Sequence, residues 1–353
     1  MLCNVDIQKA YERLTENLQS LDSVVVAYSG GVDSAFLLAA AHRVLGPERC
    51  LAVTGISPSL AAEEYDDARR IAEQVGARWI TVDTDEINDP NYQRNDENRC
   101  YYCKSELFDR LREVADEYGL AVVVDGYNAD DVGDWRPGER AARERDVRSP
   151  LKESGLGKEA IRSLSREFGL PTADKPSFAC LASRLPYGTE VTPERLELIA
   201  RAETTLREVG FRVFRVRYHG PTARLELGLD ELDRIRDHEL SSRIDNALRS
   251  YGFEHVTVDL AGFRSGSQNE SARSDDTLMG IATVAQVLKR FNIDGDAISE
   301  GRMVRLVVSG NEIGRIWERE IRSGLVDAYR NLGYPHTAVD LASSKQEIVA
   351  QKR

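Results

Sequence analysis

The chain has 353 residues and a formal charge of −12 at pH 7, from 47 Lys and Arg against 59 Asp and Glu. This length predicts two or three domains, and 41% hydrophobic with 30% charged residues is ordinary globular composition. The negative charge argues against nucleic acid as the main partner, because neutralising phosphates needs a concentrated basic surface. The sequence contains neither a long apolar run nor a signal-peptide core, so we expect a cytoplasmic location without a membrane partner.

Helical and strand patterns alternate through the first part of the chain. We predict helices at residues 6–20, 34–45, 60–75 and 105–118, and strands at 24–28, 50–54, 78–82 and 121–125. This order indicates βαβ units and a parallel sheet, and the wholly apolar strands are typical of a sheet covered on both faces. We therefore predict an α/β domain over residues 1–192. Its polar stretches 127–157 and 171–193 are predicted loops, the first long enough for a functional lid or a disordered segment.

The pattern changes after Thr192. A helix at 193–209, strands at 212–218 and 223–227, a helix at 229–250 and a strand at 255–260 form a small α+β domain, predicted to span 193–270. A gapless shift of 81 positions pairs Arg224-Leu225 with Arg305-Leu306, and Val258-Asp259-Leu260 with Val339-Asp340-Leu341. We interpret residues 277–353 as a degenerate duplicate of that domain, after a serine-rich linker at 265–276. The duplicate is hypothesised to serve packing or contacts within a homo-oligomer.

Ser29-Gly30-Gly31-Val32-Asp33-Ser34 follows an apolar strand and opens a helix. The free N–H groups of a helix N-terminus attract anions, adjacent glycines admit a phosphate without a Cβ clash, and the two serines donate further hydrogen bonds. Asp33 would repel phosphate unless it binds Mg²⁺, so its presence implies a bridging metal. The motif is neither a P-loop nor a dinucleotide fingerprint. It resembles the PP-loop of the ATP pyrophosphatases, which holds ATP, and Asp125-Gly126 resembles the second ATP and Mg²⁺ contact of that fold.

Cys100 and Cys103 form a CxxC, and Cys180 lies far along the chain. The three thiolates can serve a redox pair, a zinc site or a 4Fe-4S cluster with one open iron, and they can equally be three reduced thiols. An open iron can carry an extra sulfide. We interpret Cys3 and Cys50 as structural.

Several further stretches match one family together: Trp135-Arg136-Pro137-Gly138, Val147-Arg148-Ser149-Pro150-Leu151, Asp174-Lys175-Pro176, Ala179-Cys180-Leu181-Ala182-Ser183-Arg184 and Gly262-Phe263-Arg264-Ser265-Gly266. Over about residues 5–270 the chain resembles the LarE family, ATP-dependent sulfur transferases of nickel-pincer nucleotide cofactor biosynthesis. The resemblance implies that ATP adenylylates a carboxylate of pyridinium-3,5-dicarboxylic acid mononucleotide, with release of pyrophosphate, and that sulfur then displaces AMP. Some members give up the sulfur of a cysteine. Others hold a 4Fe-4S cluster on three cysteines, and Cys100, Cys103 and Cys180 resemble the second kind.

Arg184, Arg215 and Arg217 are the candidates to bind the phosphate and carboxylates of such a substrate, because guanidinium groups bind these anions bidentately. Glu203 and Glu226 match acidic residues that the family places near the sulfur site. All five are alternatively solvated surface charges. In the duplicate, four of these positions lose their chemistry: they are Val284, Asp296, Ile298 and Val307. We therefore expect the first copy to carry substrate binding.

Three other functions remain open. A PP-loop tRNA thiolase with a three-cysteine 4Fe-4S cluster would share the motifs, although the charge of −12 opposes tRNA binding. An amidating ligase similar to NAD synthetase would not need Cys180. A module that senses ATP or binds zinc would have no enzymatic activity.

Overall fold

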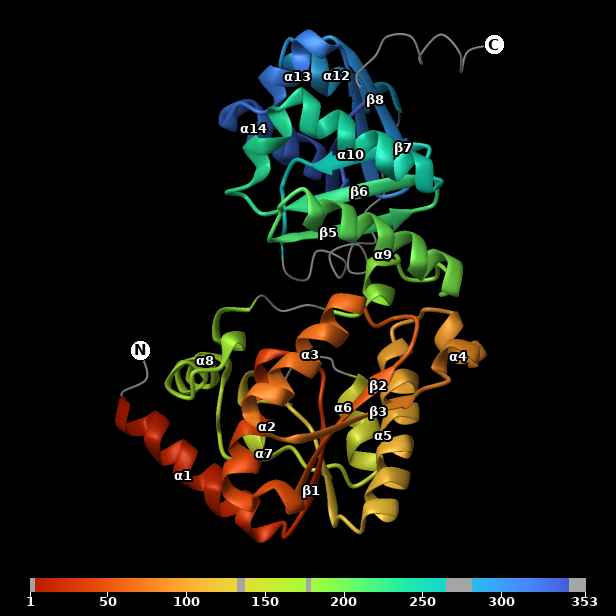
Figure 1. The fold of residues 1–353 in the computed structure, drawn as a ribbon. Helices are drawn as coiled ribbons and strands as arrows, with labels where there is room; N and C mark the ends of the chain where they lie inside the picture. Colours follow the sequence, from red (N-terminus) through yellow and green to blue (C-terminus); the bar gives the residue numbers. More distant parts are fainter. Residues whose placement is uncertain (1–3, 132–136, 176–178, 265–280, 343–353) are drawn as a thin grey trace. The chain divides into compact units, whose positions relative to one another are not determined.

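The structure is a computed structural model that describes residues 4–131, 137–175, 179–264 and 281–342 (Figure 1). The chain divides into two compact units: Met1–Leu181 with Gly188–Pro193, and Ala182–Tyr187 with Glu194–Arg353. In the described residues each unit has its own sheet. Cys3 and the predicted linker 265–276 lie outside the described residues. None of the helices in the described part is long and apolar enough to cross a membrane.

The first unit is built on a parallel sheet with the strand order β3-β2-β1-β4. Its strands are β1 (Val24–Ala27), β2 (Cys50–Ile56), β3 (Arg78–Asp83) and β4 (Val122–Val124). Its α-helices are α1 (Asn4–Ser20), α2 (Val32–Leu45), α3 (Ala62–Val75), α4 (Pro90–Gln93), α5 (Arg99–Tyr118), α6 (Pro137–Glu144), α7 (Pro150–Glu153) and α8 (Lys158–Glu167). Short 3₁₀ turns lie in this unit at Pro47–Arg49, Glu86–Asn88, Ala129–Asp131 and Pro171–Asp174. Another, Leu181–Arg184, begins at the last residue of the segment Met1–Leu181, and Leu232–Arg236 lies in the other unit. The predicted α/β fold class is confirmed.

Both faces of the sheet are covered at β1, β2 and β4, because these strands are apolar on both sides, whereas the edge strand β3 carries exposed polar residues. Val24 and Val26 face a core formed with α1, α2, α3, α7 and α8. Val25 and Ala27 face a second core formed with α5 and α6. This double cover leaves only the ends of the strands open to a ligand.

The prediction of an irregular loop over residues 127–157 is wrong for the residues that the structure describes, because they include the helices α6 and α7. Helix α6 buries Ala141 and Ala142 in the core beside α5, and Leu151 of α7 is fully buried. The charged residues that made this stretch look irregular form the outer surface of α6: Arg145, next to its end, makes a bidentate pair with Asp109 at 2.7 and 2.9 Å. Two buried alanines within a charged stretch are too weak a pattern to identify a helix from sequence.

The second unit holds a six-stranded sheet in the order β5-β6-β7-β10-β9-β8. Its strands are β5 (Phe214–His219), β6 (Thr222–Leu227), β7 (His255–Asp259), β8 (Gly295–Glu300), β9 (Met303–Val308) and β10 (His336–Asp340). Its α-helices are α9 (Pro193–Glu208), α10 (His238–Tyr251), α12 (Ile281–Arg290), α13 (Gly310–Ile316) and α14 (Arg319–Arg330). The two predicted copies contribute three strands each to this one sheet.

The helix predicted at 229–250 is in fact two pieces. The 3₁₀ turn Leu232–Arg236 ends at Asp237, whose side chain accepts hydrogen bonds from the backbone N–H groups of Glu239 and Leu240 and so begins α10. An aspartate inside a helical pattern is an N-cap signal, because its short carboxylate satisfies free N–H groups of the first turn.

The strand registers repeat with the shift found in the sequence. Phe214 pairs with Leu227 across β5 and β6, and Gly295 pairs with Val308 across β8 and β9, 81 positions further on. The parallel pairings of β6 with β7 and of β9 with β10 show the same shift. The duplicate is therefore a structural repeat, strand by strand.

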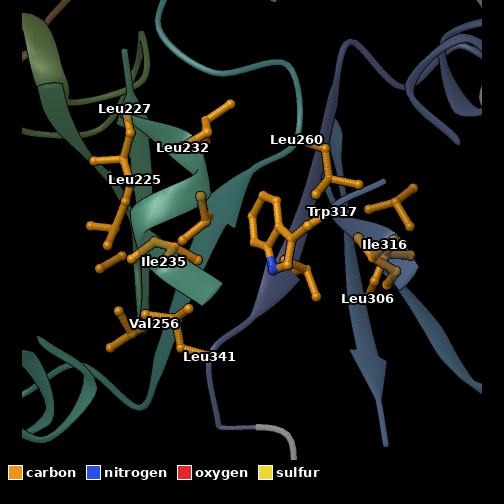
Figure 2. Close-up of a cluster of buried hydrophobic side chains, with 14 of the residues drawn as sticks. Leu225, Leu227, Leu232, Ile235, Val256, Leu260, Leu306, Ile316, Trp317 and Leu341 are labelled. Atoms are coloured by element: carbon orange, nitrogen blue, oxygen red, sulfur yellow. The ribbon is translucent and has the colours of Figure 1, made fainter. Parts of the chain in front are cut away.

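Both copies fill one hydrophobic core on one face of the sheet. Figure 2 shows Leu225 and Val256 of the first copy on one side of this core, Leu306 and Ile316 of the second copy on the other, and Trp317 between them. Helices α9, α10, α12, α13 and α14 supply the rest of this core. Because side chains alternate along a strand, the charged residues of β5, β6 and β7 lie together on the opposite face.

Candidate active site

The glycine loop of the first unit connects β1 to α2. Gly30 has a φ of +71°, and a Cβ there would lie 2.9 Å from the Cα of Ala68, so only glycine fits. Ser34 Oγ accepts the N–H of Ser29 at 3.2 Å and lies 3.1 Å from Ser29 Oγ. These contacts hold both hydroxyls at the N-terminus of a long buried helix, an arrangement that binds anions.

This loop lies at the switch point of the sheet. The chain moves outward from β1 to β2 and β3, and then returns to the other side of β1 for β4. Ligands bind at such a point, beyond the carboxyl ends of the strands. Asp125 and Gly126 follow β4, and a Cβ on Gly126 would lie 3.1 Å from the backbone nitrogen of Ser34. The two predicted nucleotide contacts are thus adjacent.

Two carboxylates at this point fit a magnesium ion, that of the buried Asp125 and that of the partly buried Asp33. Asp125 Oδ1 accepts hydrogen bonds from Ser149 Oγ at 2.7 Å and from the N–H of Tyr127 at 3.2 Å, whereas its Oδ2 has no hydrogen-bond partner in the described residues. Asp33 Oδ2 binds Lys158 Nζ at 2.9 Å, and its Oδ1 is buried and equally without a partner there. Burial raises the pKa of Asp125, and the hydrogen bond from Ser149 opposes this effect. Oxygen atoms in this state are the ligands that Mg²⁺ prefers.

The CxxC motif forms the first turn of α5. Cys100 is exposed and Cys103 is partly buried, with its Sγ 4.0 Å from Glu86 Oε1. Burial raises the pKa of Cys103 above its ordinary value, and the nearby charges of Glu86 and Cys180 add to the rise. Lys104, the next residue, lowers the pKa of Asp125. The first turn of α5 is therefore close to the nucleotide side of the sheet.

Cys180 reaches the same edge from a distant part of the chain. The N–H of Leu181 donates to the carbonyl of Ser59 at 2.9 Å, and Ser59 follows the carboxyl end of β2. Cys180 itself is exposed, and it influences the pKa values of both Cys103 and Tyr92. The fold thus brings the three predicted thiols into one neighbourhood. In the described part of the chain, however, no group of three or more His, Cys, Asp or Glu already has the arrangement of a metal site.

Three buried residues around the thiols were missed by the sequence analysis: Glu86, Tyr92 and Arg99. Arg99 Nη1 donates to Asn95 Oδ1 at 2.5 Å. Burial lowers the pKa of Arg99, but Cys180 and Cys100 raise it, and the net shift is upward. Lys158, the partner of Asp33, was also missed. These residues belong to no recognised motif, and only the tertiary fold identifies them.

The five charged residues predicted to bind substrate lie in the second unit, all nearly inaccessible to solvent. Arg184 binds Glu203 with two hydrogen bonds, Nε–Oε1 at 2.8 Å and Nη2–Oε2 at 3.1 Å. Arg217 binds Glu226 Oε2 through Nε at 3.2 Å and the carbonyl of Ser183 through Nη1 at 2.7 Å. The alternative of five solvated surface charges is therefore wrong.

Arg215 differs from its neighbours, because it has no ion pair in the described residues. Its guanidinium lies 4.4 Å from the ring centre of Phe263. Burial, followed by repulsion from Arg217 and Arg184, lowers the pKa of Arg215 to about 10. A buried cation that is not neutralised is costly. Here it leaves the five predicted substrate-binding residues, three arginines and two glutamates, with a net positive charge that an anionic ligand can neutralise.

The glycine loop at the switch point of a parallel sheet defines the first unit as a nucleotide-binding domain of the PP-loop class. Comparison with known proteins agrees, because residues 7–123 match the family described as NAD synthase. The chain is 42% identical over 263 residues to an uncharacterised protein of Synechocystis sp., covering 74% of this chain and 98% of that protein. A tRNA-specific 2-thiouridylase of Beijerinckia indica is 29% identical over 194 residues, 44% of each chain.

The most informative relative is the pyridinium-3,5-bisthiocarboxylic acid mononucleotide synthase of Lactiplantibacillus plantarum, 38% identical over 259 residues, 73% of this chain and 93% of that enzyme. The chain belongs to the family of that enzyme, the LarE family, and is an ATP-dependent, sulfur-transferring enzyme. The predicted family and enzyme class are confirmed. About a quarter of the present chain has no counterpart in these relatives.

Proposed function

We propose that the chain transfers sulfur to pyridinium-3,5-dicarboxylic acid mononucleotide in an ATP-dependent reaction. The observation that carries this proposal is the excess of buried guanidinium groups on β5, where Arg215 has no carboxylate partner in the described residues. A ligand with one phosphate and two carboxylates supplies the missing negative charge. Arg184, Arg215 and Arg217 bind these anions, and Glu203 and Glu226 orient two of the guanidiniums.

The first unit activates the acid. Ser29, Gly30, Gly31 and Ser34 hold the β- and γ-phosphates of ATP through N–H and hydroxyl groups. Asp33 and Asp125 would hold Mg²⁺, which neutralises the phosphates when it is bound. A carboxylate oxygen of the substrate attacks the α-phosphorus, the bond to the β-phosphate breaks, and pyrophosphate leaves. The acyl adenylate is then open to a sulfur nucleophile, which displaces AMP and leaves a thiocarboxylate.

Cys180 is the residue at which sulfur is delivered. Three soft thiolates within one neighbourhood suit iron and sulfide, so Cys100, Cys103 and Cys180 would hold a 4Fe-4S cluster, drawing together around it. Such a cluster supplies a labile sulfide when it is bound. Without a cluster, the Sγ of Cys180 would displace AMP to form a thioester. Loss of the Cα proton and cleavage of the Cβ–Sγ bond would then release the thiocarboxylate and leave dehydroalanine at position 180. The buried cation Arg99 stabilises negative charge at the thiols in either case.

The test is anaerobic reconstitution with iron and sulfide, followed by incubation with ATP and the dicarboxylate nucleotide. We expect pyrophosphate release that depends on the nucleotide, and a product in which sulfur replaces oxygen. The variant C180A should still release pyrophosphate but form no sulfur-containing product. Loss of one sulfur from the mass of the wild-type protein would identify Cys180 as the donor. If tRNA rather than the nucleotide stimulates pyrophosphate release, the protein is a tRNA thiolase and the proposal is wrong.

A further inference from the structure

The seam between β7 and β10 has the symmetry of a dimer interface. Val258 pairs with Val339, its own equivalent in the second copy. The N–H of Leu260 donates to the carbonyl of Thr337 at 2.8 Å, and the N–H of Leu341 donates to the carbonyl of Val256 at 2.9 Å. Each of these bonds becomes the other when the copies are exchanged. Such reciprocity is the property of a two-fold interface between identical subunits.

Charged side chains repeat the same reciprocity. Arg224 binds Asp259 in the first copy, and Arg305 binds Asp340 at 2.9 Å in the second. The histidines cross the seam: His336 Nδ1 lies 3.9 Å from Asp259 Oδ2, and His255 Nδ1 lies 3.8 Å from Asp340 Oδ2. Arg, Asp and His are identical in both copies, whereas the predicted substrate residues are not. The residues that both copies share are therefore those that form the contact between β7 and β10, whereas the predicted substrate-binding residues occur only in the first copy.

Within the described residues, the group of Arg224, Asp259 and His336 is joined to two further buried charges, Glu226 and Arg217. Arg224 Nη2 binds Glu226 Oε1 at 3.1 Å, and Glu226 Oε2 binds Arg217 Nε at 3.2 Å. A continuous series of contacts therefore runs from His336, through Asp259, Arg224 and Glu226, to Arg217. All of these side chains are almost completely inaccessible to solvent. At such low local dielectric, moving one member alters the position of the next.

The corresponding series in the second copy ends early. Valine stands at position 307, where Glu226 would be, and isoleucine stands at 298, where Arg217 would be. Arg305 instead binds Glu300 at 2.5 Å, and Glu300 accepts a hydrogen bond from Thr222 at 3.1 Å. The series of contacts therefore reaches a predicted substrate-binding residue from Arg224 but not from Arg305, which provides an internal control within one protein.

We propose that the second copy, residues 281–342, occupies the place of a second subunit, and that its His336 is a positioning residue for the substrate-binding arginines of the first copy. The inference rests on the proposed function. By filling the space beside Asp259, His336 fixes Arg224, which fixes Glu226, which holds the guanidinium of Arg217 toward the substrate. A two-fold dimer of first copies would place its partner's own equivalent histidine at the same point. The covalent duplicate provides that contact within one chain.

The experiment compares symmetry-related substitutions in the full-length protein. His336→Gln and His255→Gln are made separately, and titration calorimetry measures the affinity of each variant for ATP and for the dicarboxylate nucleotide. We expect His336→Gln to weaken nucleotide binding by about five-fold, within the usual range of coupling through contiguous networks. His255→Gln should change it less than two-fold. ATP affinity should stay unchanged in both, because the ATP contacts lie in the first unit.

A second pair, Asp259→Asn and Asp340→Asn, replaces two buried carboxylates at symmetry-related positions. The same affinity measurements on this pair test the proposal if a histidine variant does not fold. Thermal unfolding of all four variants measures the structural cost of each change. Equal effects of the two members of a pair on nucleotide affinity, or none from His336→Gln, would overturn the inference. If the wild-type protein itself does not bind the nucleotide, it is the proposed function that fails.

Discussion

Arg215 shows at the scale of one residue how function can oppose stability. Because its buried charge lacks a partner in the described residues, Arg215→Met should raise the free energy of unfolding by on the order of 1 kcal/mol. The same change should raise the KM for the nucleotide substrate. Arg217→Met is the control: it leaves Glu226 without one of its partners and should destabilise by about 3 kcal/mol. Thermal unfolding with steady-state kinetics tests both, and destabilisation by Arg215→Met would contradict the assignment of excess charge.

Glu153 provides a pH-dependent contribution to stability. The pKa of this carboxyl is lowered to about 2, first by hydrogen bonds from Arg148 and then by those from Asn17 and Ser149. A group whose folded-state pKa is depressed stabilises the protein above its unfolded pKa and loses this effect as the pH falls toward the folded value. The contribution should therefore be full above about pH 4.5 and disappear near pH 2.

Glu153→Gln measures that contribution. Because both partners are partly exposed, solvent screening limits it to about 1 kcal/mol at pH 7. Urea unfolding at pH 7 and at pH 3 should show the difference between wild type and variant shrinking at the lower pH. A difference that grows with acidity would show that the carboxylate is not held by Arg148.

At the scale of elements, the glycine loop is the most constrained connection of the nucleotide-binding domain. Gly30→Ala introduces a Cβ that meets the backbone of Ala68 at a positive φ, so the loop must move. We expect pyrophosphate release to fall at least a hundredfold. Gly119→Ala, at another positive φ but with open space around it, should cost about 1 kcal/mol of stability and leave turnover intact. Similar turnover in both variants would show that the loop does not bind phosphate.

Sequence patterns predicted the elements wherever apolar residues recur at a clear period. The strands of the first unit and β5, β6 and β7 of the second were found in this way, whereas β10 was inferred only through the 81-position repeat. Helix α6 was missed because its buried face consists of alanines, and the break before α10 was missed because Asp237 stands within a helical pattern.

The candidate site could be predicted from the sequence only where its residues form a local motif. The glycine loop and the CxxC are local patterns, so their residues were identified without a structure. Arg224 and His336 are 112 positions apart in the chain and meet Asp259 only because β10 pairs with β7. Contacts of this kind depend on strand pairing, which no single motif encodes.

At the scale of the whole molecule, the second copy is an integral part of the fold of the second unit. It pairs with β7 and supplies part of the core that Figure 2 shows. A chain ending at Arg264 would expose the edge of β7 together with Val256 and Val258, a template for pairing with another chain. We expect this truncated protein to self-associate or precipitate. Light scattering after size exclusion tests this, and a stable monomer with unchanged thermal unfolding would contradict it.

The reciprocal contact between β7 and β10 also affects which substitutions the two copies can accumulate during evolution. In an assembly of identical subunits, every substitution occurs on both sides of the symmetry axis, so neither side can specialise. Here both sides are encoded separately in one polypeptide. Val307 and Ile298 could therefore replace charged residues on one side while Glu226 and Arg217 persisted on the other. Duplication within the chain thus gives the enzyme what a homodimer cannot have: a half that is free to lose the chemistry and keep only the contact.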